Sequence, residues 1–190
     1  NKELKNIYDD SYFKLGEFMG ILDISLDQVN HKFKNSDFHW DVQTIDLIKS
    51  RLTFIENEND KKIIRYFLDA YKENVEINDL KLRKMFIHND GNDQNILVDR
   101  NGQFNGIIDF GDMVYSYRAA EPGICMAYVA LGKGEPYKAM ANILKGYHSK
   151  FPLKNIELEA ITYISFIRIC ISVTMAAWRS KLFPSNKYLF

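Results

Sequence analysis

The sequence predicts a mainly α-helical protein with one small β-hairpin, an α+β fold in which the helices dominate. Apolar residues recur at helical spacing both before residue 80 and after residue 118 of the 190-residue chain. The middle is different, because the apolar runs 96–98 and 104–108 are short and flank the turn-forming residues Asp99-Arg100-Asn101-Gly102. No linker or internal repeat interrupts the pattern, so residues 1–190 are expected to form a single unit.

Six segments have the apolar spacing of helices, and they cover residues 11–28, 42–56, 59–76, 119–131, 136–149 and 155–182. Gly16 and Gly20 lie four residues apart, on one face of the first of these helices, and we expect that face to pack closely on a neighbour. Pro136 suits a first helical position, and Asn155 suits an N-cap. These signals define the helical body of the fold.

Composition and charge exclude several classes of protein. Lys plus Arg and Asp plus Glu both number 25, so the formal net charge is zero, which argues against a nucleic-acid or acidic-membrane partner. The apolar stretch 160–178 carries Arg168 near its centre and is therefore expected to be a buried helix. Cys125 and Cys170 lie in apolar surroundings and predict buried free thiols in a reducing compartment. We expect a cytoplasmic protein.

The residues on either side of the predicted hairpin carry the chemistry. Asn95 directly precedes the first strand and Asp109 directly follows the second, so an antiparallel hairpin brings the two side chains together. An amide oxygen and a carboxylate suit Mg²⁺, which keeps several waters of its own. Asp90 lies on the loop that enters the same hairpin, and an acid beside such a metal pair is what phosphoryl transfer to a hydroxyl requires.

Two linked motifs resemble those of a known family. His88-Asn89-Asp90-Gly91-Asn92-Asp93-Gln94-Asn95, followed by Asp109-Phe110-Gly111, has the protein-kinase spacing and is most similar to the aminoglycoside phosphotransferase and choline kinase branch. Within this branch the sequence most resembles hydroxylysine kinase and the phosphotransferase domains fused to class III aminotransferases. The segments that suggest this subgroup are His39-Trp40-Asp41, Ile107–Val114 and Gly146-Tyr147-His148.

The resemblance implies a role for each motif residue. Asp90 would be the catalytic base, and Asn95 and Asp109 the ligands of Mg²⁺, with ATP or GTP as phosphoryl donor. The acceptor would be a small-molecule alcohol or amine, such as 5-hydroxylysine, an aminoglycoside or a choline-like compound. Asn89 stands where the family usually has Gly, which leaves the base and metal positions intact and alters the loop.

The resemblance covers only the C-terminal lobe of such kinases. Nothing before His88 resembles a β-rich N-terminal lobe with a glycine-rich loop and a phosphate-binding lysine. We therefore expect a fragment of a longer chain, whose N-terminal nucleotide-binding lobe would be its partner, and we expect the fragment alone to be inactive. Self-association of two lobes across the exposed cleft face is an open alternative.

Further polar residues are candidates for the acceptor site, each with a plainer structural alternative. A zwitterionic acceptor needs partners for its ammonium and carboxylate groups, and an aromatic face beside them suits an amine. His88 is expected to support the loop structurally. The substrate-binding candidates are Trp40, Asp41, Asp112, Glu121 and Arg168. The alternatives are a helix entry with Asp41 as N-cap and Trp40 packed behind it, an acid near the metal or an N-cap-like residue beyond Gly111 for Asp112, and structural ion pairs for Glu121 and Arg168.

Two other functions remain open at this stage. A non-catalytic lobe that binds or regulates a fused enzyme would explain the missing nucleotide-binding half. A Mg²⁺-dependent phosphohydrolase would use the same acidic residues to activate water. The upstream coding sequence distinguishes the first alternative from a kinase, and a phosphorylated acceptor distinguishes the second.

Overall fold

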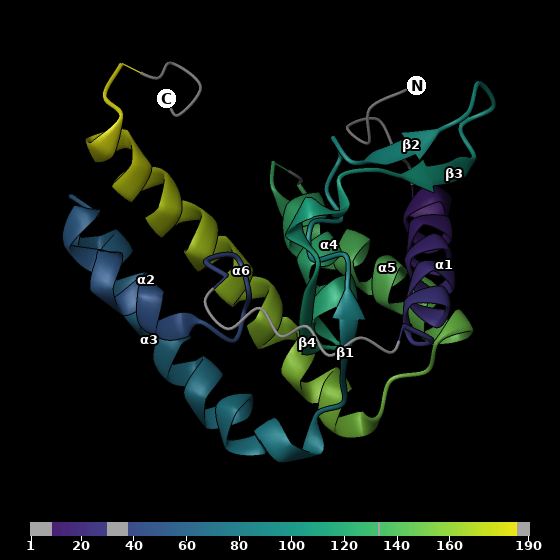
Figure 1. The fold of residues 1–190 in the computed structure, drawn as a ribbon, viewed down its shortest axis with the longest axis horizontal. Coiled ribbons are helices and arrows are strands. Elements are labelled where there is room, and N and C mark those ends of the chain that lie inside the picture. The colour runs from purple at the N-terminus through teal and green to yellow at the C-terminus, as the bar shows by residue number, and fades with distance from the viewer. Residues whose placement is uncertain (1–8, 30–37, 133, 186–190) are drawn as a thin grey trace.

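The computed structural model describes residues 9–29, 38–132 and 134–185 and confirms the mainly helical fold with little β-structure (Figure 1). The six predicted helices are all present, as α1 (Asp9–Leu26), α2 (Ile45–Arg51), α3 (Glu58–Asn74), α4 (Ala120–Ala130), α5 (Pro136–Lys150) and α6 (Asn155–Leu182). The described residues also form short 3-10 helices, η2 (Leu52–Phe54), η3 (Glu76–Lys81) and η4 (Phe110–Asp112).

The helix starts confirm one prediction from the sequence and correct two others. Pro136 is the first residue of α5, as expected. Asn155 was expected to cap α6, but it is the first residue of the helix, and the N-cap is Lys154. The N-cap of α2 is Thr44, so Asp41 does not cap a helix. Instead the Asp41 carboxylate accepts a hydrogen bond from the backbone N–H of Gln43, at 3.0 Å, and forms a local turn.

The strands form two sheets rather than the single hairpin that was predicted. The predicted hairpin is present, as β2 (Ile96–Val98) paired antiparallel with β3 (Phe104–Ile107). A second two-stranded sheet pairs β1 (Lys84–Ile87) with β4 (Val114–Tyr117), also antiparallel. The sequence analysis missed this sheet because its strands are short and far apart along the chain.

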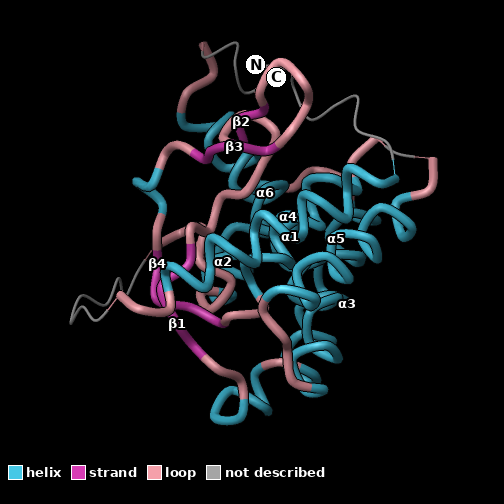
Figure 2. Tube along the Cα trace, turned by 90° about the vertical axis from the view of Figure 1, so that its right-hand side faces the viewer, coloured by secondary structure: helices cyan, strands magenta, loops and turns pink. Residues whose placement is uncertain are grey.

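The two sheets fix the path of the chain around the candidate site. The connection 88–95 runs from β1 to β2, and the connection 108–113 returns from β3 to β4. Because both connections run between the same two strand pairs, they lie beside one another, as the tube in Figure 2 shows near the magenta strands. The second sheet therefore completes a frame that holds both motifs together.

The helices pack around α6 in two groups (Figure 1). Helices α2 and α3 lie along one side of α6, and α4 lies on the other side with α5 and α1 beyond it. One core fills the space among α2, α3, α6 and the β1–β4 sheet, and a second lies among α1, α4 and α5. Cys125 and Cys170 are free and buried, as expected.

The contact between α1 and α5 depends on glycine. A Cβ atom at Gly16 would lie 2.0 Å from the carbonyl oxygen of Ile143, and one at Gly146 would lie 1.9 Å from that of Phe13. The two helix backbones therefore approach more closely than any side chain would allow. This confirms the close packing predicted for the face of α1 that carries Gly16 and Gly20.

Helix α6 is the one described helix that is long and apolar enough to cross a membrane on length and composition alone. Of its most apolar window, 56% is buried inside the protein, and Arg168 near the middle is 1% exposed. Both observations match the buried helix that the charge of Arg168 predicted.

Candidate active site

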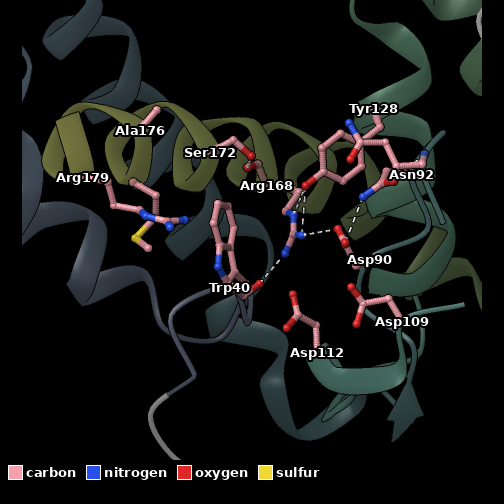
Figure 3. A pocket seen from close by; sticks show the side chains of 12 residues that line it. Trp40, Asp90, Asn92, Asp109, Asp112, Tyr128, Arg168, Ser172, Ala176 and Arg179 are labelled. Atoms are coloured by element: carbon pink, nitrogen blue, oxygen red, sulfur yellow. Dashed lines mark hydrogen bonds and ion pairs between the residues drawn. The ribbon is translucent and has the colours of Figure 1, made fainter. Parts of the chain in front are cut away.

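Asp90, at the centre of the candidate site, has its carboxylate held by three donors, of which Figure 3 shows Asn92 and Arg168. Its Oδ2 accepts hydrogen bonds from the amide groups of Asn95, at 2.7 Å, and Asn92, at 2.9 Å. Its Oδ1 accepts one from Nη2 of Arg168, at 3.1 Å. The carboxylate is thereby oriented, and Oδ1, with a single donor, keeps a free lone pair for another partner.

Asn95 and Asp109 offer two oxygens that nothing in the described chain uses. The Asn95 amide nitrogen donates to the carbonyl oxygen and to Oδ2 of Asp90, so the amide oxygen is turned away and accepts no hydrogen bond. The Asp109 carboxylate is exposed and likewise accepts none from the described residues. The hairpin pairing Ile96↔Ile107 and the bond from the Ile108 N–H to the Asn95 carbonyl, 3.0 Å, bring these two residues to the same end of the hairpin, as predicted.

This donor set fits a hard divalent cation with few protein ligands. Among residues 9–29, 38–132 and 134–185, no group of three or more His, Cys, Asp or Glu side chains is arranged to hold a metal. One carboxylate and one amide oxygen suit Mg²⁺, which commonly takes one or two protein ligands and completes its shell with water and substrate phosphates. Asn95 and Asp109 therefore do not form a closed structural metal site.

His88 links the two connections through both nitrogens of its ring. Its Nδ1 accepts the backbone N–H of Asp90, at 3.3 Å, and its Nε2 lies 3.0 Å from the carbonyl oxygen of Ile108. Because Nδ1 accepts, the proton is on Nε2 and the imidazole is neutral. Burial lowers the pKa of His88, which favours the same neutral state. The structural role expected for His88 matches these contacts.

The unusual Asn89 has a backbone reason. Its φ is 67°, in the left-handed region that Gly adopts freely and Asn tolerates better than other residues. Its side-chain amide also donates to the carbonyl oxygen of Asp112, at 3.1 Å. Asn is therefore a workable substitute for the glycine usual at this position, and it adds a contact between the two connections.

Glu121 supports the connection 88–95 through hydrogen bonds to its backbone. It is fully buried, and its Oε2 accepts the backbone N–H groups of His88, at 2.5 Å, and Asn89, at 3.2 Å. Burial raises the pKa of Glu121 to about 7. Asp23, also fully buried, has its pKa raised by burial and by the charge of Glu121. These two acids form a buried pair rather than a substrate-binding site.

A pocket of about 550 Å³ opens beside Asp90 and Asp109 (Figure 3). Of the five substrate-binding candidates, Trp40, Asp112 and Arg168 line it. Asp41 and Glu121 do not, because Asp41 bonds Gln43 and the Ser116 hydroxyl while Glu121 bonds the loop backbone. Burial, together with the charges of Asp90 and Asp109, raises the pKa of Asp112.

Arg168 lines the pocket with its hydrogen bonds already made. Its Nη1 donates to the carbonyl oxygen of Trp40, at 2.6 Å, and Nε and Nη2 donate to the Tyr128 hydroxyl, at 3.2 and 3.0 Å. With Asp90 as a further partner, the guanidinium is committed to protein groups, as the alternative reading of a structural ion pair had it.

Several residues that line the pocket were not among the predicted site residues, and they are Asn92, Gln94, Tyr128, Ser172, Met175, Ala176 and Arg179. Arg179 carried a usable signal, because it follows Arg168 by eleven residues, three helical turns, in a predicted helix. Residues 168, 172, 175, 176 and 179 of α6 all line the pocket and form one stripe along it.

The fold and the site together define the class of this protein, a lobe of a kinase-like phosphotransferase. A family model described as the phosphotransferase enzyme family matches residues 34–152, more than half of the chain. The chain belongs to this phosphotransferase enzyme family.

Relatives and solved structures agree with this assignment. The chain is 29% identical to hydroxylysine kinase of Mus musculus and 27% identical to that of Bos taurus, in each case over 92% of this chain and 50% of the relative. It thus spans about half the length of the curated relatives it matches. Amicoumacin kinase hAmiN, solved in complex with AMP-PNP, Ca²⁺ and Ami, shares its fold at a TM-score of 0.68 and 16% identity, over 94% of this chain and 54% of that one. A microcompartment-associated aminopropanol kinase also shares the fold, at a TM-score of 0.69 and 15% identity, over 90% of this chain and 55% of that one.

Proposed function

We propose that this chain is the C-terminal lobe of a small-molecule kinase that transfers the γ-phosphoryl group of a nucleoside triphosphate to an alcohol. One observation carries the proposal: the Asp90 carboxylate is fixed at a pocket that Asp109 also lines, and neither the Asn95 amide oxygen nor the Asp109 carboxylate accepts a hydrogen bond from the described residues. Phosphoryl transfer needs a base, a cation site and room for an acceptor, and these features supply all three.

The residues have distinct parts in the proposed reaction. The acceptor hydroxyl donates to Oδ1 of Asp90, and its oxygen bonds to the γ-phosphorus while the bond from that phosphorus to the β–γ bridging oxygen breaks. The hydroxyl proton passes to Asp90, and a nucleoside diphosphate leaves. Arg168, Asn92 and Asn95 hold the carboxylate in place throughout. Asn95 and Asp109 would hold Mg²⁺, which neutralises charge on the phosphates when it is bound.

The nucleotide-binding half is assigned to an N-terminal lobe of a longer chain. The chain spans half of its curated relatives, which leaves room for such a lobe. Ile108 and Phe110, on either side of Asp109, are 47% and 44% exposed, an apolar surface that a second lobe would cover. The proposed donor is ATP or GTP. Hydroxylysine kinase relatives support a hydroxylated amino acid such as 5-hydroxylysine as acceptor.

The test replaces the proposed base in the longer protein that carries this chain. Asp90→Asn should lower turnover by about 10²–10⁴-fold, the usual contribution of a general base, with nucleotide binding retained. Asp93→Asn is the matched control, since it makes the same change three residues away in the same loop, at a side chain outside the pocket lining. Equal turnover in the wild type and Asp90→Asn would remove Asp90 from the mechanism.

A further inference from the structure

The pocket has a positively charged end that the proposed chemistry does not use. Two cations line it, Arg168 and Arg179, and three carboxylates line it, those of Asp90, Asp109 and Asp112. Arg168 is committed to Asp90, Trp40 and Tyr128. Arg179 is exposed, and its guanidinium has no ion pair or hydrogen bond with any residue in the described ranges. It is therefore the one lining cation of the described chain that remains available to a ligand.

The position of Arg179 sets its distance from the reacting end. Arg168 and Arg179 lie on the same stripe of α6, and a rise of about 1.5 Å per residue separates their α-carbons by about 16 Å. In Figure 3 the Arg179 side chain extends from α6 toward Trp40, on the side of that ring opposite Arg168. In this view Trp40 stands between the Arg179 guanidinium and Arg168 with its partner Asp90.

From the pocket lining we infer that Arg179 binds the carboxylate of the acceptor, so that the site prefers hydroxylated amino acids to amino alcohols that lack a carboxylate. This inference rests on the proposed function and deepens it by assigning the specificity-determining residue. Arginine presents a planar fork of donors that matches a carboxylate in a bidentate way. The acceptor then lies along α6, with its hydroxyl at Asp90 and its carboxylate at Arg179.

The length of the acceptor sets the distance that this orientation requires. In extended 5-hydroxylysine five bonds separate the carboxyl carbon from the hydroxyl oxygen, a span of about 6 Å for bonds of about 1.5 Å. A hydrogen bond of about 2.8 Å at each end brings the distance from Asp90 to Arg179 to about 11–12 Å. An amino alcohol without the carboxylate would engage the Asp90 end alone.

The experiment compares two ligands that differ only in the carboxylate, 5-hydroxylysine and 1,5-diaminopentan-2-ol, by calorimetric titration of the 190-residue chain. In the wild type the amino acid should bind about 10- to 100-fold more tightly, the effect of a charge-assisted pair. Arg179→Met should remove that advantage and leave the affinity for the diamine unchanged. Lys181→Met is the matched control, because it removes a neighbouring exposed charge of α6 that pairs with Glu56 and lies outside the pocket lining.

The outcomes separate this inference from the proposed function. Equal affinity of the wild type for both ligands, or equal weakening of both by Arg179→Met, would overturn the role of Arg179 while leaving phosphoryl transfer untouched. Failure of both ligands to bind would overturn the acceptor class together with Arg179. Loss of transfer is measured independently, with Asp90→Asn, and does not depend on either titration.

Discussion

Arg168 Nη2 lies 3.1 Å from Oδ1 of Asp90, although the two residues are 78 positions apart in the sequence. The Arg168 side chain is 2% exposed and that of Asp90 is 18% exposed, so the pair is largely removed from water. A buried guanidinium and a carboxylate depend on each other, because either one alone would be a desolvated charge. The pair thus joins α6 to the connection 88–95, which carries the proposed catalytic base.

Breaking this pair should be costly from either side. Arg168→Met and Asp90→Asn are each expected to lower the free energy of unfolding by about 3 kcal/mol, the low end for a buried pair, since Asp90 keeps some exposure. The double variant should cost clearly less than the sum of the two, because it leaves no unpaired charge. Urea denaturation of the chain measures all four proteins. Strictly additive losses would show that the two groups do not interact.

Asn89 offers a test of the backbone argument. Asn89→Gly should be more stable than Asn89→Ala by about 1 kcal/mol, because the left-handed conformation strains Ala while both variants lose the bond to Asp112. Asn101, in the hairpin turn, lacks a positive φ and serves as control, where Ala should equal or exceed Gly. Urea midpoints of the four variants decide the matter. The same order at both positions would remove the conformational explanation.

Glu121 should make stability depend on pH. Its pKa is raised from 4.5 to about 7 in the folded chain, chiefly by burial, so its contribution is fully present below about pH 4.5 and is lost as the pH rises through about 7. Glu121→Gln keeps an acceptor for the loop N–H groups and cannot ionise. Its stability relative to the wild type should therefore rise between pH 5 and pH 8, by about 1–3 kcal/mol.

The comparison cancels titrating groups whose pKa does not depend on the charge of Glu121, such as His88, whereas the linked titration of Asp23 is part of the measured difference. The lowered pKa of His88 acts in the opposite direction, since stability then falls as the pH drops below about 6.5, and it does so in the wild type and the variant alike. Glu159→Gln, at an exposed position of α6, should follow the wild type at every pH. If the free energies of unfolding of Glu121→Gln and the wild type differed by the same amount at every pH, ionisation of Glu121 would not destabilise the fold.

Adding a side chain at the glycine contact between α1 and α5 should destabilise the fold. Gly16→Ala gains helix propensity of about 1 kcal/mol but places a methyl group against the Ile143 carbonyl, so a net loss of about 2–3 kcal/mol is expected. Gly134→Ala is the control, because a Cβ atom there would meet nothing within 4 Å. Thermal unfolding followed by circular dichroism compares the two. An unchanged or higher midpoint for Gly16→Ala would contradict the close approach of the helices.

The helices and the hairpin could be predicted from local sequence patterns. The six helices and the β2–β3 hairpin follow from apolar periodicity and from the turn at Asp99–Gly102, which are encoded within a few residues. The meeting of Asn95 and Asp109 followed from the hairpin itself. These features needed no knowledge of distant neighbours.

The features that the sequence did not predict depend on contacts between distant segments of the chain. Strand β4 is four residues long and acquires its partner, β1, from a segment 30 residues earlier, so its own pattern was too short to identify. The loss of Asp41 from the pocket likewise reflects a distant partner, since its Oδ1 accepts a hydrogen bond from the Ser116 hydroxyl at 2.7 Å. The commitment of Arg168 to Asp90 is of the same kind. Such contacts depend on how the helices pack, which composition and spacing do not encode.

The most direct test of the central claim follows the label of a γ-labelled nucleoside triphosphate. The longer protein that carries this chain is incubated with Mg²⁺, 5-hydroxylysine and labelled ATP or GTP. The products are then separated and identified by mass spectrometry. We predict label on the hydroxyl oxygen of the amino acid, lost in Asp90→Asn and kept in Asp93→Asn. Label released only as free phosphate would indicate hydrolysis, label left on the nucleotide would indicate a non-catalytic lobe, and either result would contradict the account.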